Sequence, residues 1–258
     1  TQTPLNEQDL KMMSEAVEVL RQFKGFSYFT EMSDIINRLE DHVASARMKT
    51  TPVIDFEKNE SLKGLDYLDT IYHAIVNEHP IQLKYRSFKA RSANSFIFYP
   101  YLLKEYRNRW FVYGVRGNGR ILQNLALDRI QSLEVLPQEH YIKNTFFDPN
   151  TFFDDLVGVT KNTGSVAEKV GFKVAAAEAP YIITKPIHRS QQVMERLADG
   201  SVILEIEVVI NHELERVFFR YAEGIQVLYP KTLVELMGRK LKKAAESAER
   251  GNCLLYTS

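Results

Sequence analysis

The apolar residues of the N-terminal quarter follow a helical period. From Asn6 to about Lys24, and again from about Thr30 to Ala46, they recur at steps of three and four residues. This pattern predicts two amphipathic helices that pack as a hairpin. A polar linker at 49–64, with a short strand at Val53–Phe56, then leads to a third helical pattern at Leu65–Asn77.

After this helix the period changes from helical to extended. Five short stretches rich in β-branched and aromatic residues follow, at about 81–86, 96–103, 110–115, 121–127 and 129–136. Arg116-Gly117-Asn118-Gly119 contains the Asn-Gly signal of a tight hairpin. We expect these strands to close into a small barrel, because closure removes the exposed edges of a short sheet.

The C-terminal half begins with an aromatic-rich connection from Pro137 to Thr163. From Ser165 onward the pattern predicts strand, helix, strand, strand, helix and strand, which is the element order of a ferredoxin-like sandwich. A final helix is expected from Pro230 to about Arg250. Its basic cluster is predicted to be a solvated face and consists of Arg239, Lys240, Lys242 and Lys243.

The predicted fold class is therefore α+β, with an N-terminal helical segment, a small Sm-like (SH3-like) β-barrel and a C-terminal ferredoxin-like α/β sandwich. The expected boundaries are 1–64 for the helical segment and linker, 65–137 for the barrel with its leading helix, 138–164 for the connection, 165–250 for the ferredoxin-like region and 251–258 for a tail.

Composition and charge limit the kind of binding site and the cellular compartment that the chain can have. Thirty-three Lys and Arg balance thirty-three Asp and Glu, so any basic site must be local rather than a property of the whole molecule. The single cysteine, Cys253, fits a reducing cytoplasm. We expect no membrane segment, and the polar start with Pro4 suggests a linker that follows an upstream domain.

The sequence contains no recognisable catalytic or metal-binding motif. Its six histidines show neither zinc-ligand spacing nor a cysteine partner, and no carboxylate pair is placed for acid–base work. We therefore predict that the chain is not an enzyme and has neither a metal nor a cofactor.

Arginine and tyrosine are dense in the predicted barrel. They are Tyr85, Arg86, Arg91, Tyr99, Tyr101, Arg107, Arg109, Tyr113, Arg116, Arg120 and Arg129. Guanidinium groups bind phosphate and aromatic rings stack on bases, so this composition favours a nucleotide-like ligand. In the alternative interpretation, Trp110 and Phe111 fill the core, and Arg120 and Arg129 form structural ion pairs with a carboxylate such as Asp128.

Short motifs in this region resemble a known family. They are Leu83-Lys84-Tyr85, Tyr99-Pro100-Tyr101-Leu102-Leu103, Arg109-Trp110-Phe111-Val112-Tyr113-Gly114 and Arg120-Ile121-Leu122-Gln123-Asn124-Leu125-Ala126-Leu127-Asp128-Arg129-Ile130. In order and spacing they resemble the WYL-domain transcription regulators of bacteria. Three later motifs resemble the C-terminal extension of these proteins: His188-Arg189-Ser190-Gln191, Asp199-Gly200 and Val227-Leu228-Tyr229-Pro230.

The resemblance implies a region that senses nucleic acid or a nucleotide-like effector and signals to an N-terminal winged helix-turn-helix domain, which binds DNA and is missing from this sequence. We also expect a homodimer. An alternative is a dimerisation module without a small ligand of its own. Solution mass would separate the two readings.

By position, the family's ligand-facing residues correspond to Tyr85, Trp110 and Arg129, with Asn124 as a neighbour. Arg109 and Arg116 join them on charge alone. Two departures affect the assignment. The signature Tyr and Leu are here Phe111 and Val112, and an ungapped alignment puts Gln123 at the family's first arginine, so Arg120 replaces that arginine only if the strand register shifts.

Overall fold

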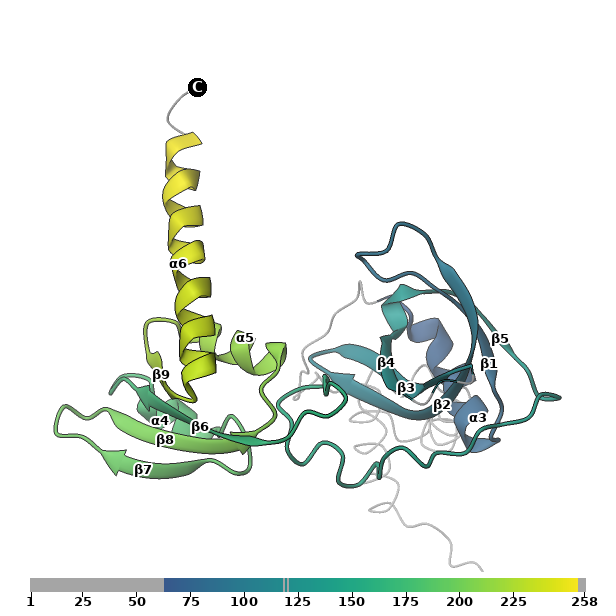
Figure 1. Ribbon diagram of the computed structural model, residues 1–258, viewed down its shortest axis with the longest axis horizontal. Helices are drawn as coiled ribbons and strands as arrows, with labels where there is room; N and C mark the ends of the chain where they lie inside the picture. Colours follow the sequence, from purple (N-terminus) through teal and green to yellow (C-terminus); the bar gives the residue numbers. More distant parts are fainter. Residues whose placement is uncertain (1–62, 118, 120, 255–258) are drawn as a thin grey trace, which may run out of the picture. The chain divides into compact units, whose positions relative to one another are not determined.

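The computed structural model describes residues 63–254 except 118 and 120, and its chain divides into two compact units, Thr1–Phe146 and Phe147–Ser258 (Figure 1). We describe each unit by itself. The helices predicted at 6–24 and 30–46, the strand at 53–56 and the tail beyond 254 lie outside the described residues.

The first unit is a short helical segment followed by an antiparallel sheet. Its elements are η3 (Leu65–Tyr67), α3 (Leu68–Val76), β1 (Ile81–Tyr85), β2 (Asn94–Tyr106), β3 (Arg109–Arg116), β4 (Leu122–Ala126), η4 (Leu127–Arg129) and β5 (Ile130–Val135). The strands lie in the order β4-β3-β2-β1-β5. The predicted helix and all five predicted strands are present.

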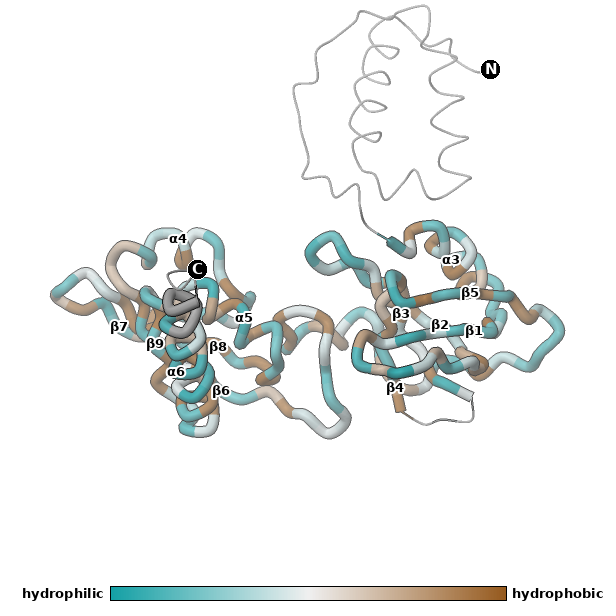
Figure 2. The backbone as a smooth tube through the Cα atoms, turned by 90° about the horizontal axis from the view of Figure 1, so that it is seen from above, coloured by the Kyte–Doolittle hydropathy of each residue, from teal (hydrophilic) through white to brown (hydrophobic). Residues whose placement is uncertain are grey.

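The core of this unit is formed by buried side chains of α3 and of the sheet. Leu68 and Ile71 of α3 have no exposed surface and pack in one cluster with Ile81 and Leu83 of β1. Side chains of a strand alternate between its faces, so burial of Ile81 and Leu83 directs Lys84 outward and brings Tyr85 to the sheet's end near η4. Figure 2 shows the resulting interleaving of hydrophobic and hydrophilic residues.

The prediction of a closed barrel is wrong. β4 and β5 are the two edges of the sheet, and no pairing joins them among the described residues. The only chain between them is the helical turn η4, so the backbone leaves the extended conformation where a closing ladder would have to begin. Both edge strands are short, with 5 and 6 residues, which limits the unpaired backbone that they expose.

The second unit has the element order that the apolar pattern predicts. It contains β6 (Glu168–Val174), α4 (Ala179–Thr184), β7 (Gln192–Arg196), β8 (Val202–Val208), α5 (His212–Arg220), β9 (Ile225–Tyr229) and α6 (Lys231–Leu254), with strand order β7-β8-β6-β9. α4 begins at Ala179. Pro180 lies in its first turn, where a missing N–H costs nothing.

Only the first half of α6 contributes to the core of this unit. Leu233 and Met237 are buried with the sheet residues, whereas nearly every residue from Gly238 to Glu249 is exposed. The basic cluster at 239–243 is therefore on the surface, as predicted. No helix in the described part of the chain is long and apolar enough to cross a membrane.

Gly114 provides a test of the packing in the first unit. A Cβ at this position of β3 would lie 2.1 Å from the backbone oxygen of Tyr99 and 2.6 Å from the Phe98 ring. We expect Gly114→Ala to lower the free energy of unfolding by about 3 kcal/mol, because a backbone oxygen cannot move aside cheaply.

Gly238→Ala is the matched control. This helical glycine has no atom within 4 Å of an added Cβ, so the same change should raise the stability of its unit by about 1 kcal/mol. Urea unfolding measures both values. Equal effects from the two substitutions would contradict the close packing at Gly114.

Candidate functional site

The turn η4 places two charged residues side by side at the edge of the first sheet. Leu127 is 1% exposed and packs into the core, which fixes the turn. Gly64 lies against it so closely that a Cβ would be 2.3 Å from the Leu127 oxygen. The backbone N–H of Arg86 donates to the Arg129 oxygen at 3.1 Å, so the β1–β2 loop begins on this turn.

The side chain of Arg129 lies between Tyr85 and Phe88. The guanidinium carbon of Arg129 is 4.6 Å from the centre of the Phe88 ring. The guanidinium group of Arg129 also hydrogen-bonds to the Tyr85 hydroxyl. Burial raises the pKa of Tyr85, while the charge of Arg129 acts in the opposite direction. The Nε atom of Arg129 is buried and has no hydrogen-bond partner among the described residues, so part of its donor capacity is unused.

Asp128 supplies an acceptor beside these donors. Its Oδ2 lies 3.5 Å from a guanidinium nitrogen of Arg109, and its Oδ1 is buried without a hydrogen-bond partner in the described part of the chain. Asp128 therefore forms its ion pair with Arg109, whereas the alternative interpretation of the sequence assigned that pair to Arg129. Together the turn offers hydrogen-bond donors, one acceptor and an aromatic face, which suit a phosphate-bearing heterocycle.

The remaining predicted residues do not join this group as one site. Trp110 is partly buried and packs against the core of the unit. Asn124 pairs with Tyr113 in the β3–β4 ladder. Arg116 stacks at 4.0 Å on Phe96 and lies at the opposite end of β3 from Arg109, roughly 23 Å away along the strand. Arg120 lies outside the described residues.

Sequence reasoning missed Phe88 and Lys89. Phe88 is 73% exposed at the tip of the β1–β2 loop, and Lys89 is exposed beside it. A signal was available, because no Asp or Glu occurs between Glu78 and Glu105. An aromatic residue among uncompensated cations is typical of a surface that contacts nucleic acid.

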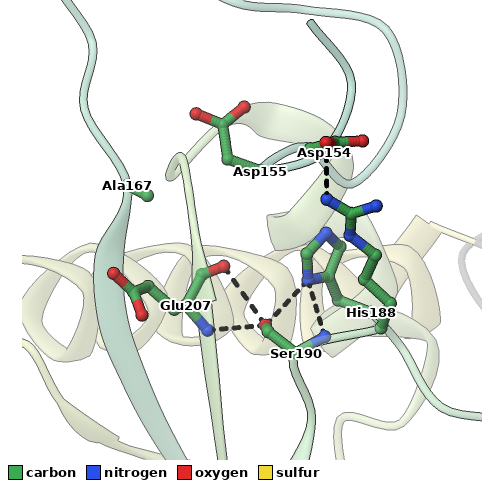
Figure 3. Close-up of a pocket in the computed structure, with 7 residues that line it drawn as sticks. Asp154, Asp155, Ala167, His188, Ser190 and Glu207 are labelled. Carbon is green, nitrogen blue, oxygen red and sulfur yellow. Dashed lines mark hydrogen bonds and ion pairs between the residues drawn. The ribbon is translucent and has the colours of Figure 1, made fainter. Parts of the chain in front are cut away.

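The second unit contains a hollow of about 490 Å³ (Figure 3). It is lined by Asp154, Asp155, Ala167, His188, Arg189, Ser190 and Glu207. Two of its carboxylates are paired within the fold: Arg189 lies 2.7 Å from Asp154, and Lys161 binds both oxygens of Asp155 at 2.8 and 2.7 Å. The described residues contain no group of three or more His, Cys, Asp or Glu that could hold a metal ion.

His188 and Ser190 hold the chain that enters β7. His188 Nδ1 accepts the Ser190 N–H at 3.2 Å and lies 2.8 Å from Ser190 Oγ. That hydroxyl oxygen also accepts the N–H of Glu207, at 2.9 Å, which ties the turn to β8. Gln191 completes the arrangement by donating to the Ile182 oxygen and accepting from Ile187 N–H. The motif at 188–191 thus fastens α4 and β8 to the start of β7.

Burial lowers the pKa of His188 from its usual value of 6.5, although a hydrogen bond with the backbone of Asp154 opposes this effect. The folded protein therefore favours the neutral ring, and protonation would place a proton on the nitrogen that accepts from Ser190. Stability from this residue is complete above pH 6.5 and is lost as the pH falls from 6.5 toward the lowered value.

His188→Asn tests this dependence. The Asn oxygen can accept the same N–H but does not titrate, so the variant should lose less stability than the parent when the pH falls from about 7 to about 5. Unfolding free energies measured by denaturant across this range provide the comparison. Parallel pH curves for the two proteins would contradict the assignment.

Residues 66–135 match the WYL domain and residues 167–245 match the WCX domain. No curated protein matches the chain.

Among solved structures, the chain is similar to proteasome accessory factor B/C (PafBC) of Arthrobacter aurescens, with 14% identity, 78% of this chain covered and a TM-score of 0.30. It spans only 29% of that protein. A CRISPR Cas-related protein is also similar, with 9% identity, coverage of 97% of this chain and 88% of that one, and a TM-score of 0.46. The two domain matches together span more than half of the sequence, and the chain belongs to the WYL-domain family, with a WCX domain after its WYL domain.

Proposed function

We propose that this chain is the effector-sensing region of a bacterial transcription regulator and that its WYL domain binds nucleic acid or a nucleotide-like, phosphate-bearing ligand at η4. The observation that carries the proposal is Arg129, whose guanidinium lies between Tyr85 and an exposed aromatic ring and keeps a buried donor unused.

The charges around η4 support an anionic ligand. The protein as a whole is neutral, but the residues from His79 to Lys104 include five Lys or Arg and no acid. Arg109 contacts Asp128 of η4, and Arg86 of this segment hydrogen-bonds to the neighbouring Arg129. A local positive surface attracts phosphate even where the net charge is zero, and its effect weakens as salt rises.

We also propose the finer features of such a regulator. The first unit is taken as an Sm-like fold whose sheet stays open, and the strand order β7-β8-β6-β9 supports a ferredoxin-like second unit. The full regulator would be a cytoplasmic homodimer that binds DNA through an N-terminal domain.

A second candidate function is dimerisation without a ligand. The observation that favours it is the largely exposed second half of α6, where the apolar side chain of Leu241 remains 37% exposed. Isolated helical ends of this kind gain most of their stability from packing. A monomeric solution mass at micromolar concentration would argue against this candidate.

Arg129→Ala tests the ligand-binding proposal. We expect the variant to bind a fluorescein-labelled single-stranded oligonucleotide about 10- to 100-fold more weakly at low salt, because a charged hydrogen-bond donor at the site is lost. Fluorescence anisotropy at two salt concentrations measures the affinity and its salt dependence.

Lys231→Ala is the control for net charge. Its side chain is 90% exposed at the start of α6, in the other unit, so its removal should leave affinity nearly unchanged. If the parent protein does not bind at low salt, or if both variants bind as it does, the proposal fails.

A further inference from the structure

The loop between β1 and β2 presents an ordered aromatic side chain to solvent. Ala90 N–H donates to the Ser87 oxygen at 3.0 Å, so residues 87–90 form a tight turn with Phe88 at its second position. The Phe88 side chain is 73% exposed. In Figure 1 this loop is drawn in blue, between the ends of β1 and β2.

The guanidinium group of Arg129 lies against one face of the Phe88 ring. The guanidinium of Arg129 lies 4.6 Å from the ring centre, a distance at which a cation and an aromatic face attract each other. The backbone bond from Arg86 to Arg129 holds the loop and η4 together. The guanidinium of Arg129 therefore holds the Phe88 ring in place, while most of the ring surface remains available for stacking with a planar group of a ligand.

Exposed cations flank Phe88 in the sequence. They are Lys84, Arg86, Lys89 and Arg91. None of the four forms an ion pair with another described residue, in contrast to Arg109, which lies against Asp128. They occupy four of the eight positions from 84 to 91, so this short segment carries four positive charges. A ligand with several phosphates would use this surface more fully.

We propose that the turn Ser87–Ala90 is a contact site for single-stranded nucleic acid, in which one base stacks on Phe88 and adjacent phosphates lie against Lys89, Arg91 and Arg86. This inference rests on the function proposed above and specifies its ligand as an oligonucleotide rather than a mononucleotide. A base sandwiched on Phe88 would extend the stack that begins with Arg129.

The chemistry favours a single strand over a duplex. In a duplex each base already stacks on its neighbours and shows only its edges, so an exposed ring at the tip of a turn gains little from it. In a single strand the faces of the bases are accessible, and stacking on an aromatic side chain tolerates every sequence.

The experiment separates base stacking from phosphate binding. The probes are a labelled oligothymidylate of about ten nucleotides and a labelled abasic strand of equal length, each titrated against the parent chain, Phe88→Ala and Phe88→Leu. We expect Phe88→Ala to weaken oligothymidylate binding about tenfold and to leave the abasic strand unaffected. Phe88→Leu keeps apolar volume but no ring, and should resemble the Ala variant.

The double variant Lys89→Ala with Arg91→Ala is the complementary test. It should weaken both probes by similar factors and reduce the salt dependence of binding, because phosphates are common to the two strands. Phe88 lies on the surface, so circular dichroism of the variants should match that of the parent protein.

The outcomes distinguish the two proposals. Failure of the parent protein to bind either strand overturns both. Binding that Arg129→Ala abolishes, but that Phe88→Ala leaves unchanged or weakens equally for both strands, overturns only the stacking contact. Competition by thymidine monophosphate at the affinity of the oligonucleotide would also overturn it, because a mononucleotide would then satisfy the site.

Discussion

The burial of Leu127 is the constraint on which the candidate site depends. This residue sits in the core of the first unit, and Gly64 packs directly against its backbone. With its first position fixed in this way, η4 must direct Asp128 and Arg129 to the edge of the sheet. The burial of Leu127 thus fixes the position of Arg129. The backbone hydrogen bond from Arg86 to Arg129 in turn fixes the start of the β1–β2 loop.

The same turn prevents closure of the sheet and leaves polar groups unused. A continuous ladder between β4 and β5 would occupy the backbone where η4 now lies. Instead, one oxygen of Asp128 and one nitrogen of Arg129 are buried without partners in the described region. Such atoms cost about 1–3 kcal/mol each, and a ligand or bound water that satisfies them recovers part of that cost.

In the second unit, several polar side chains hydrogen-bond to the segments that connect its helices and strands. His188 and Ser190 hydrogen-bond within the turn before β7, and Asn211 donates to the oxygens of Val157 and Thr160 while it accepts the Leu214 N–H at the start of α5. These side chains stabilise the connections between elements. The motif at 188–191 therefore has a structural explanation, and the strongest candidates for ligand contact are in the first unit.

The sequence by itself determined the α+β class, the element order of both sheets and the surface position of the basic residues in α6, because these follow from apolar period and local propensity. It also predicted Tyr85, Arg109 and Arg129 as ligand contacts, and the structure places all three at η4. It could not show that Arg109 rather than Arg129 lies against Asp128 or that the sheet stays open, since both depend on how Leu127 anchors η4 in the core. Only the tertiary structure brought Phe88 onto Arg129, because 41 residues of chain separate the two and no local pattern encodes a contact at that range.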